Sequence, residues 1–296
     1  MQKLNFIEDS VVDRHYIFII NPISGTKKIK NINELINRKF AKESFEIYTT
    51  EYQNHATVIS SQYSDQPNVV LVSVGGDGTL NEIAQSLINK EAKLGIIPNG
   101  SGNGFAGHLF VDKNIHHCLE RLKNNRYALV DVLLINDKIC CNTIGIGLSG
   151  YVAKIFNQNG KRGLYQYMKL GLGKFSEFKS FGIQIDGQEF NSNISVEIAN
   201  SSQLGNNAYI SPDSLIQDGI AEIILLTKPK AYQIPGLIYD VFNRRLNSNK
   251  LTQNFISSDS LLKLKDENYY HIDGDYKGMS AEFEFKVLKS VLKIVV

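Results

Sequence analysis

Proline and cysteine are both scarce in this sequence. It holds six prolines and three cysteines in 296 residues, and Cys140 and Cys141 are neighbours. So few prolines argue against a Pro-rich disordered chain. An odd number of cysteines without a CxxC spacing argues against a disulfide framework or a cysteine metal site. We therefore expect a folded protein from a reducing compartment.

The sequence also lacks a long apolar run and a large excess of charge. No stretch approaches the roughly 20 apolar residues that cross a bilayer, and residues 1–20 place acids ahead of a short apolar run, unlike a signal peptide. The formal net charge of +2 argues against a nucleic-acid partner held by phosphate neutralisation. We expect a cytoplasmic protein with at most peripheral contact at the inner face of the membrane. Its oligomeric state is left open, a homodimer included.

Strand-like and helical patterns alternate through residues 1–125. The expected strands are 16–20, 45–50, 68–74 and 93–98, and the helical patterns are 27–43, 55–63, 79–90 and 114–125. Strands separated by helices pair in parallel, and near-continuous apolar strands are typical of a sheet covered on both faces. This half is predicted to be a doubly wound, mostly parallel α/β nucleotide-binding domain.

Residues 126–296 follow a different rhythm. Strand-like runs joined by Asp-Gly and Asn-rich turns dominate, and only 161–181 and 230–246 have helical patterns. This indicates a second domain, a β-rich antiparallel sandwich that we expect to take the acceptor. The last strand, about 288–296, is expected to pack back on the first domain.

Three glycine-rich loops follow three strands of the first domain. They read NPISGTKK (21–28), GGDGT (75–79) and PNGSGNGFA (98–106), and no GxxxxGK[ST] loop occurs. The carboxyl ends of parallel strands share one rim, where bare backbone N–H groups bind anions. Asp77 would repel a phosphate unless a cation lies between them, which points to phosphate with magnesium. One such loop alone is often only a structural turn, but three on one rim favour a ligand.

These loops resemble the signature blocks of the diacylglycerol kinase catalytic family, which includes soluble bacterial lipid kinases and the sphingosine and ceramide kinases. Their order, their spacing and the β-rich second half agree with it, and further blocks fall at 148–153, 212–223 and 271–276. GGDGT alone also occurs in NAD kinases, so the combination of blocks is the specific feature. The resemblance spans nearly the whole chain.

The resemblance also implies roles for individual residues. Nucleotide contacts fall to Asn21, Ser24, Gly25, Thr50, Gly75, Gly76, Asp77, Gly78, Thr79, Asn81, Gly100, Ser101 and Asn103. Asp77 would stand on the magnesium side, and Leu215, Asp218 and Ile220 would form a structural magnesium site. Asp273 and Asp275 would be the catalytic base and its partner.

The IDGD segment that carries these last two acids has a second interpretation. Asp-Gly is a favoured pair for a type I′ hairpin turn, and the chain repeats it at Asp186-Gly187, which we predict to be a turn without a catalytic role. On an extended segment, Asp273 and Asp275 would share a face and work together. The family resemblance favours the catalytic interpretation at 273–275.

Two positions depart from the family pattern. Asp275 stands where the family has a longer Glu, and Ser149 stands where it usually has Asp. The loss of an acid at 149 favours a neutral acceptor over a cationic sphingoid base. Separately, segment 160–181 mixes lysines with aromatic residues; it fits a membrane-surface helix or a helix packed under the second sheet with its basic side chains outward.

We therefore predict an ATP- and Mg²⁺-dependent lipid kinase. Its first acceptor would be diacylglycerol, giving phosphatidic acid, and its second a sphingoid-type lipid. The expected partners are this lipid and, transiently, the membrane surface. One alternative is an NAD kinase-like enzyme with a soluble acceptor. Another is a nucleotide- or lipid-binding protein with degraded catalysis, which the changes at Ser149 and Asp275 would explain.

Overall fold

The computed structural model describes residues 4–11, 13–24, 31–110, 114–158 and 178–296, together with 171, 173 and 175. Predicted site residue Gly25 and most of segment 160–181 lie outside these residues. The elements of the first half are β1 (Ile7–Glu8), β2 (His15–Ile20), α1 (Ile32–Lys39), β3 (Ser44–Thr49), α2 (His55–Ser61), β4 (Val69–Gly75), α3 (Asp77–Leu87), β5 (Lys93–Pro98), α4 (Gly104–Leu109) and α5 (Ile115–Leu122).

The first half is a parallel sheet covered on both faces. Its strands pair in the order β5-β4-β2-β3. Alternate residues of β2 enter different cores: Ile17 packs in the core that includes α2 and α3, and Phe18 packs in the one that includes α1 and α5. Every residue of the central strand β4 is buried. The predicted doubly wound fold is confirmed.

The second half is mainly antiparallel. Its elements are β6 (Arg126–Ile135), β7 (Lys138–Cys140), β8 (Thr143–Gly147), α6 (Leu148–Gln158), β9 (Phe181–Ile185), β10 (Gln188–Ala199), β11 (Gln203–Gly205), β12 (Ala208–Tyr209), β13 (Ala221–Thr227), α8 (Ile234–Phe242), β14 (Thr252–Ser257), β15 (Asp259–Ile272) and β16 (Asp275–Val295). Short 3₁₀ turns lie at Ala231–Gln233 and Leu246–Ser248. Strands pair in the order β14-β13-β10-β8-β15-β16 around a core of their own. The predicted β-rich second domain is confirmed.

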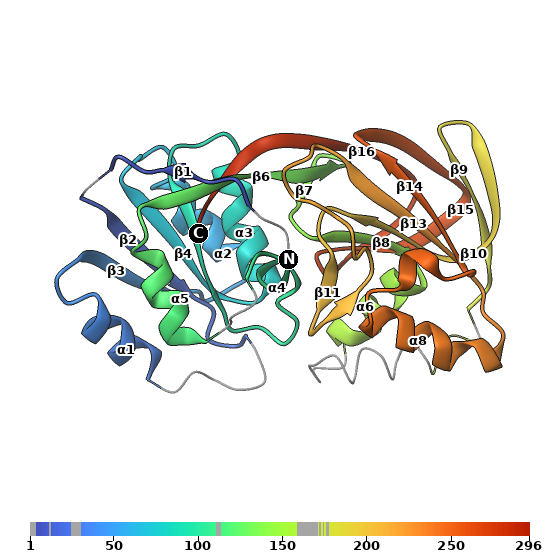
Figure 1. The fold of residues 1–296 in the computed structure, drawn as a ribbon, viewed down its shortest axis with the longest axis horizontal. Helices are drawn as coiled ribbons and strands as arrows, with labels where there is room; N and C mark the ends of the chain where they lie inside the picture. The colour runs from blue at the N-terminus through green and yellow to red at the C-terminus, as the bar shows by residue number, and fades with distance from the viewer. Residues whose placement is uncertain are drawn as a thin grey trace.

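Strand β16 runs through both halves of the molecule. It pairs with β15 over residues 275–286, with β6 over residues 285–295, and with β5 at Ile294 and Leu94. Figure 1 shows β6 and β16 passing side by side along the upper edge from one half to the other. Residues at the start of β6 and the end of β16, such as Val130 and Leu292, belong to the core of the first half.

Four elements of the second half were not predicted. Helix α6 lies where the sequence was interpreted without a helix, and β11, β12 and β14 lie in stretches where no strand was expected. None of the helices in the described parts of the chain has the length and apolar character needed to span a bilayer.

Candidate active site

The three glycine-rich loops meet at the carboxyl ends of β2, β4 and β5. Asn21 Nδ2 donates to Thr79 Oγ1 at 3.0 Å, which ties the first loop to the second. The backbone N–H of Asn99 donates to the carbonyl of Gly75 at 2.7 Å, which ties the third loop to the second. The expected common rim is therefore present.

Some of the glycines are needed for this loop packing itself. A Cβ at Gly100 would lie 2.4 Å from the Cα of Gly76, and a Cβ at Gly75 would lie 2.5 Å from Thr79 Oγ1. Gly78 differs, because its added Cβ would meet only Asp275 Oδ2, at 3.4 Å. This position is where the GGDGT loop approaches the second half of the molecule.

Asp77 begins helix α3 and also contacts the third loop. Its Oδ2 accepts a hydrogen bond from the N–H of Gly104 at 3.0 Å, and its Oδ1 accepts one from Phe105 at 3.2 Å. The carboxylate thus caps the first turn of α4.

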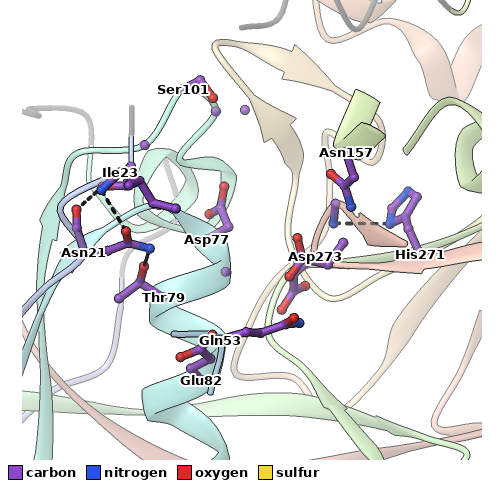
Figure 2. Close-up of a pocket in the computed structure, with 18 of the residues that line it drawn as sticks. Asn21, Ile23, Gln53, Asp77, Thr79, Glu82, Ser101, Asn157, His271 and Asp273 are labelled. Carbon is purple, nitrogen blue, oxygen red and sulfur yellow. Dashed lines mark hydrogen bonds between the residues drawn. The ribbon is translucent and has the colours of Figure 1, made fainter. Parts of the chain in front are cut away.

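A cleft of about 820 Å³ separates these loops from the β-rich half. In Figure 2, Asn21, Asp77 and Thr79 lie on one side of it and Asn157, His271 and Asp273 on the other. The predicted site residues that line it are Asn21, Ser24, Thr50, Gly76, Asp77, Gly78, Thr79, Gly100, Ser101, Asp273 and Asp275. Those found behind its wall are Gly75, Asn81 and Asn103.

The IDGD segment is a hairpin turn whose acids also line the cleft. Asp273 and Gly274 have φ values of 51° and 86°, and Ile272 pairs with Asp275 across the turn. The expectation that Asp273 and Asp275 share a face of an extended segment is therefore wrong, because the left-handed turn aims the two carboxylates differently. The matching pair Asp186-Gly187, at 48° and 89°, forms the turn predicted for it.

Asp273 is enclosed by hydrogen-bond donors. Its Oδ1 accepts from the N–H groups of Asn142 (2.8 Å) and Thr143 (3.1 Å) and from the Cys140 thiol (3.0 Å). Its Oδ2 accepts from the N–H of Cys141 (2.9 Å) and from Asn81 Nδ2 (2.7 Å). Five donors fill the roughly four lone-pair positions of a carboxylate. Burial raises the pKa of the Cys140 thiol, which keeps its proton in place to donate.

Asp275 has a more open environment. Its side chain is 49% exposed, and Lys277 Nζ lies 3.9 Å from its Oδ2. Together with the approach of Gly78, this places the Asp275 carboxylate in the cleft, opposite the glycine-rich rim. Of the two acids, Asp275 is the one without the enclosing backbone donors that surround Asp273.

A buried polar cluster lies beneath the turn. The N–H of Gly274 donates to His271 Nδ1 at 3.3 Å, and His271 Nε2 lies 4.0 Å from Glu197 Oε2. Ser195 Oγ donates to Glu197 Oε1 and contacts Ser149 Oγ, each at 3.0 Å. Burial lowers the pKa of His271 to about 4 and raises that of Glu197 to about 7.

The predicted structural magnesium residues lie on the loop between β12 and β13. The N–H of Ile220 donates to Asp218 Oδ1 at 3.1 Å, and Leu215 is exposed. Burial raises the pKa of Asp218, and the neighbouring Asp131 carboxylate adds to the rise. Mg²⁺ takes oxygen ligands, and this loop offers the Asp218 carboxylate together with backbone carbonyl groups. Among the described residues, no group of three or more His, Cys, Asp or Glu side chains could hold a metal.

Several cleft residues were not predicted. They include Tyr52, Gln53, Glu82, Asn142, Thr143, Asn157, His271 and Lys277. Most lie outside the glycine-rich loops, on segments without a motif, so only the tertiary structure brings them to the site.

The fold and the cleft define a two-domain protein with a glycine-rich rim on one domain and a carboxylate facing it from the other. Residues 15–135 match the diacylglycerol kinase catalytic domain, and residues 142–296 match the YegS C-terminal NAD kinase beta sandwich-like domain. The chain belongs to the diacylglycerol kinase catalytic family, as its loops indicated.

Individual relatives agree with this family. The chain is 29% identical over 193 residues to a protein of Enterobacter sp. (strain 638) named probable lipid kinase YegS-like. The alignment covers 61% of this chain and 63% of that protein. The chain is also 29% identical over 191 residues to the protein of the same name from Yersinia enterocolitica, covering 60% and 63%. These alignments span less than two thirds of the relatives' length.

Solved structures share the fold. A putative diacylglycerol kinase from Bacillus anthracis str. Sterne superposes with a TM-score of 0.76 at 18% identity, covering 97% of this chain and 96% of the other. A second structure from that organism, a diacylglycerol kinase, gives a TM-score of 0.71 at 19% identity, covering 96% of each chain. At this identity the likeness concerns the fold alone.

Proposed function

We propose that this protein transfers the γ-phosphoryl group of ATP to the hydroxyl group of a neutral lipid, with diacylglycerol as the favoured acceptor. The observation that carries the proposal is the approach of Asp275 to the GGDGT loop, with Asp275 Oδ2 3.4 Å from an added Cβ at Gly78. This approach supports Asp275 as a proton acceptor across the cleft from the proposed phosphate site. The family of the chain supports it.

In this reaction the first domain binds the phosphates. Gly76–Thr79 and Gly100–Ser101 line the cleft, and α3 adds the positive end of its dipole. The acceptor oxygen forms a bond to the γ-phosphorus while the bond from that phosphorus to the β–γ bridging oxygen breaks. ADP leaves with the electron pair, and the proton of the hydroxyl group passes to the Asp275 carboxylate.

We assign Asp273 a positioning role. Its filled acceptor positions leave no place for the proton of an incoming hydroxyl group. The same bonds fix the turn that carries Asp275 against the 140–143 segment and against Asn81 of α3. The base thereby keeps its distance from the phosphate-binding rim.

Magnesium would be held by Asp77, because it lines the cleft and a carboxylate is the kind of oxygen ligand that Mg²⁺ takes. When bound, the ion neutralises charge on the phosphate oxygens. Leu215, Asp218 and Ile220 remain our proposed second, structural magnesium site.

Two features support a neutral acceptor over a cationic sphingoid base. Ser149 has no charge, and the acid beside its hydroxyl, Glu197, is buried with a pKa raised to about 7. This carboxyl group is therefore partly protonated at neutral pH and supplies less than a full negative charge. A lipid acceptor also requires transient contact with a membrane surface.

A radiolabelled phosphate-transfer assay tests the proposal. The full chain is incubated with γ-labelled ATP and Mg²⁺ and with diacylglycerol, sphingosine, ceramide or NAD, the lipids being dispersed in mixed micelles. Labelled phosphatidic acid is the expected product. Transfer to NAD but to no lipid would replace the proposal with a soluble acceptor, and nucleotide binding without transfer to any acceptor would refute it.

The role of Asp275 is tested by two substitutions. Asp275→Asn should lower kcat at least 100-fold, because general-base catalysis contributes roughly 10²–10⁴-fold, while ATP affinity changes little. Asp275→Glu should retain more activity than the amide, since it keeps a carboxylate. A loss confined to ATP binding would contradict the assignment.

A further inference from the structure

The charges around the cleft are unbalanced for a protein that binds a polyphosphate. Five acidic side chains line it: Glu51, Asp77, Glu82, Asp273 and Asp275. Among the lining residues that the structure describes, Lys277 alone carries a permanent positive charge. A triphosphate entering this cleft meets repulsion that a nearby ammonium group would reduce.

Lys277 lies beside the proposed base. Its Nζ is 3.9 Å from Asp275 Oδ2, the same oxygen that an added Cβ at Gly78 would approach to 3.4 Å. The ammonium group is therefore on the acceptor side of the cleft, across from the GGDGT loop. At 3.9 Å the contact is too long for a hydrogen bond, so it leaves the N–H donors of Lys277 for another acceptor.

Strand β16 has a bulge at Lys277. Tyr276 pairs with His271, but the next pair joins Gly278 to Tyr270, so β16 has one more residue than β15 at Lys277. Gly278 has a φ of 114°, which glycine adopts readily. Bulges of this kind re-aim side chains and occur next to active sites.

We propose that Lys277 is a catalytic residue that contacts the γ-phosphoryl group as it moves from ATP to the acceptor. This inference rests on the proposed function and adds a residue to it. Phosphoryl transfer depends on positioning and on positive charge near the phosphate oxygens. Lys277 supplies that charge from the side of the attacking hydroxyl group. The simpler alternative is a half-exposed ion pair with Asp275, which would contribute little to the reaction.

Kinetics of a charge-removing variant provide the first test. Lys277→Met should lower kcat about 100-fold or more, the range found when one stabilising donor is removed from a transition state. Lys277→Arg should recover part of this loss because it keeps the charge. The control is Lys286→Met, an exposed lysine of the same strand that does not line the cleft, and it should match the wild type. An unchanged kcat in Lys277→Met overturns the proposal.

The pH profile separates contact with phosphate from an effect on Asp275. A lysine that only favours the ionised form of Asp275 would, on removal, shift the acid limb of kcat/KM to higher pH. Activity would then recover fully at alkaline pH. We expect the loss in Lys277→Met to persist across the profile, and full recovery would contradict phosphate contact.

Nucleotide binding gives a readout that needs no turnover. Calorimetry with ATP and with ADP, both with Mg²⁺, should show that Lys277→Met weakens ATP binding about tenfold and leaves ADP within twofold. Equal losses for both nucleotides, or none, overturn the proposal. If the wild type bound ATP but phosphorylated no acceptor, the proposed function would fail, and this comparison would still decide whether Lys277 contacts the γ-phosphate.

Discussion

The two acids of the IDGD turn differ in their surroundings, and this difference separates their roles. Asp273 accepts bonds from Asn81 in the first half and from the 140–143 segment in the second. Asp275, two residues on, has a half-exposed carboxylate that faces the GGDGT loop. One acid therefore joins the two halves at the cleft, and the other is the one to which we assign the role of base.

Removal of the charge at Asp273 should destabilise the protein. In Asp273→Asn, an NH₂ group replaces one oxygen and faces N–H donors such as Asn81 Nδ2 or the N–H of Cys141. Buried donors without an acceptor cost about 1–3 kcal/mol each, so we expect the free energy of unfolding to fall by about 2–4 kcal/mol in urea denaturation.

The second Asp-Gly hairpin provides a matched control. Asp186 occupies the same turn position, but its carboxylate accepts from the N–H of Leu261 at an exposed site. Asn is well tolerated in such turns, and Asp186→Asn should change the free energy of unfolding by less than about 0.5 kcal/mol. Equal effects of the two substitutions would show that the turn, and not the enclosed carboxylate, sets the stability.

These two hairpins show which part of the site the sequence alone does not predict. An Asp-Gly pair predicts a turn correctly at both places, and in that respect the pairs are alike. Asp273 differs through donors that lie 130–133 residues away in the chain. Only the tertiary structure brings these donors to it, so the sequence predicts the acid and the turn but not the enclosed carboxylate.

The glycines of the three loops fall into two groups according to what surrounds them. Gly76 and Gly100 allow the second and third loops to touch, Gly75 leaves room for the Thr79 side chain, and Gly78 keeps the space toward Asp275 open. The sequence explained all of these glycines by access of phosphate to the backbone. The structure divides them, because close loop packing accounts for some and the cleft for another.

Two alanine substitutions test this division. Gly100→Ala would force the loops apart, because its Cβ would lie 2.4 Å from a backbone atom of Gly76. We expect ATP affinity to fall about tenfold or more, measured by calorimetry, because the N–H groups of both loops would move. Gly78→Ala serves as the contrast, since its Cβ would make an ordinary contact at 3.4 Å with a side-chain oxygen. Comparable losses of ATP affinity would argue against separate roles.

The parallel strands were the easiest elements to predict, and α6 was the hardest. Strands such as β4 are buried on both faces, so their apolar runs are nearly continuous. Helix α6 contains Gly150 in its first turn, and a glycine there indicates a turn in the sequence. The structural reason is a close approach: a Cβ at Gly150 would lie 2.4 Å from the carbonyl oxygen of Tyr269 in β15. The close packing of α6 against β15 therefore requires a glycine at position 150.

At the scale of the whole molecule, the long strand β16 connects the two halves. Because β16 pairs with β15, β6 and β5, the residues that form the turn at its beginning and the core at its end belong to a single element. Asp275 and Lys277 stand at the start of this strand. Their distance from the glycine-rich loops is thus set by a strand that is anchored in both cores.

Glu197 and His271, which are buried beneath the IDGD turn, make the stability of the fold depend on pH. Burial raises the pKa of Glu197 to about 7 from 4.5, and it lowers the pKa of His271 to about 4 from 6.5. The folded state binds the Glu197 proton more tightly than the unfolded chain does, so this contribution is present below about pH 4.5 and is lost as pH rises to about 7. His271 acts in the opposite direction, because stability rises as pH increases from about 4 to 6.5.

Substitution of Glu197 should isolate one of these effects. Glu197→Gln cannot titrate, and Ser195 can still donate to its carbonyl oxygen. The His271 contribution is common to both proteins and cancels in the comparison. The variant should gain free energy of unfolding relative to the wild type as pH rises from 5 to 8, by up to about 3 kcal/mol, since each pKa unit corresponds to 1.36 kcal/mol. Urea denaturation across this range measures the gain, with Glu282→Gln as an exposed control. Parallel curves for Glu197→Gln and the wild type would show that Glu197 is ionised alike in the folded and unfolded states, and would remove the buried acid from the account of a neutral acceptor site.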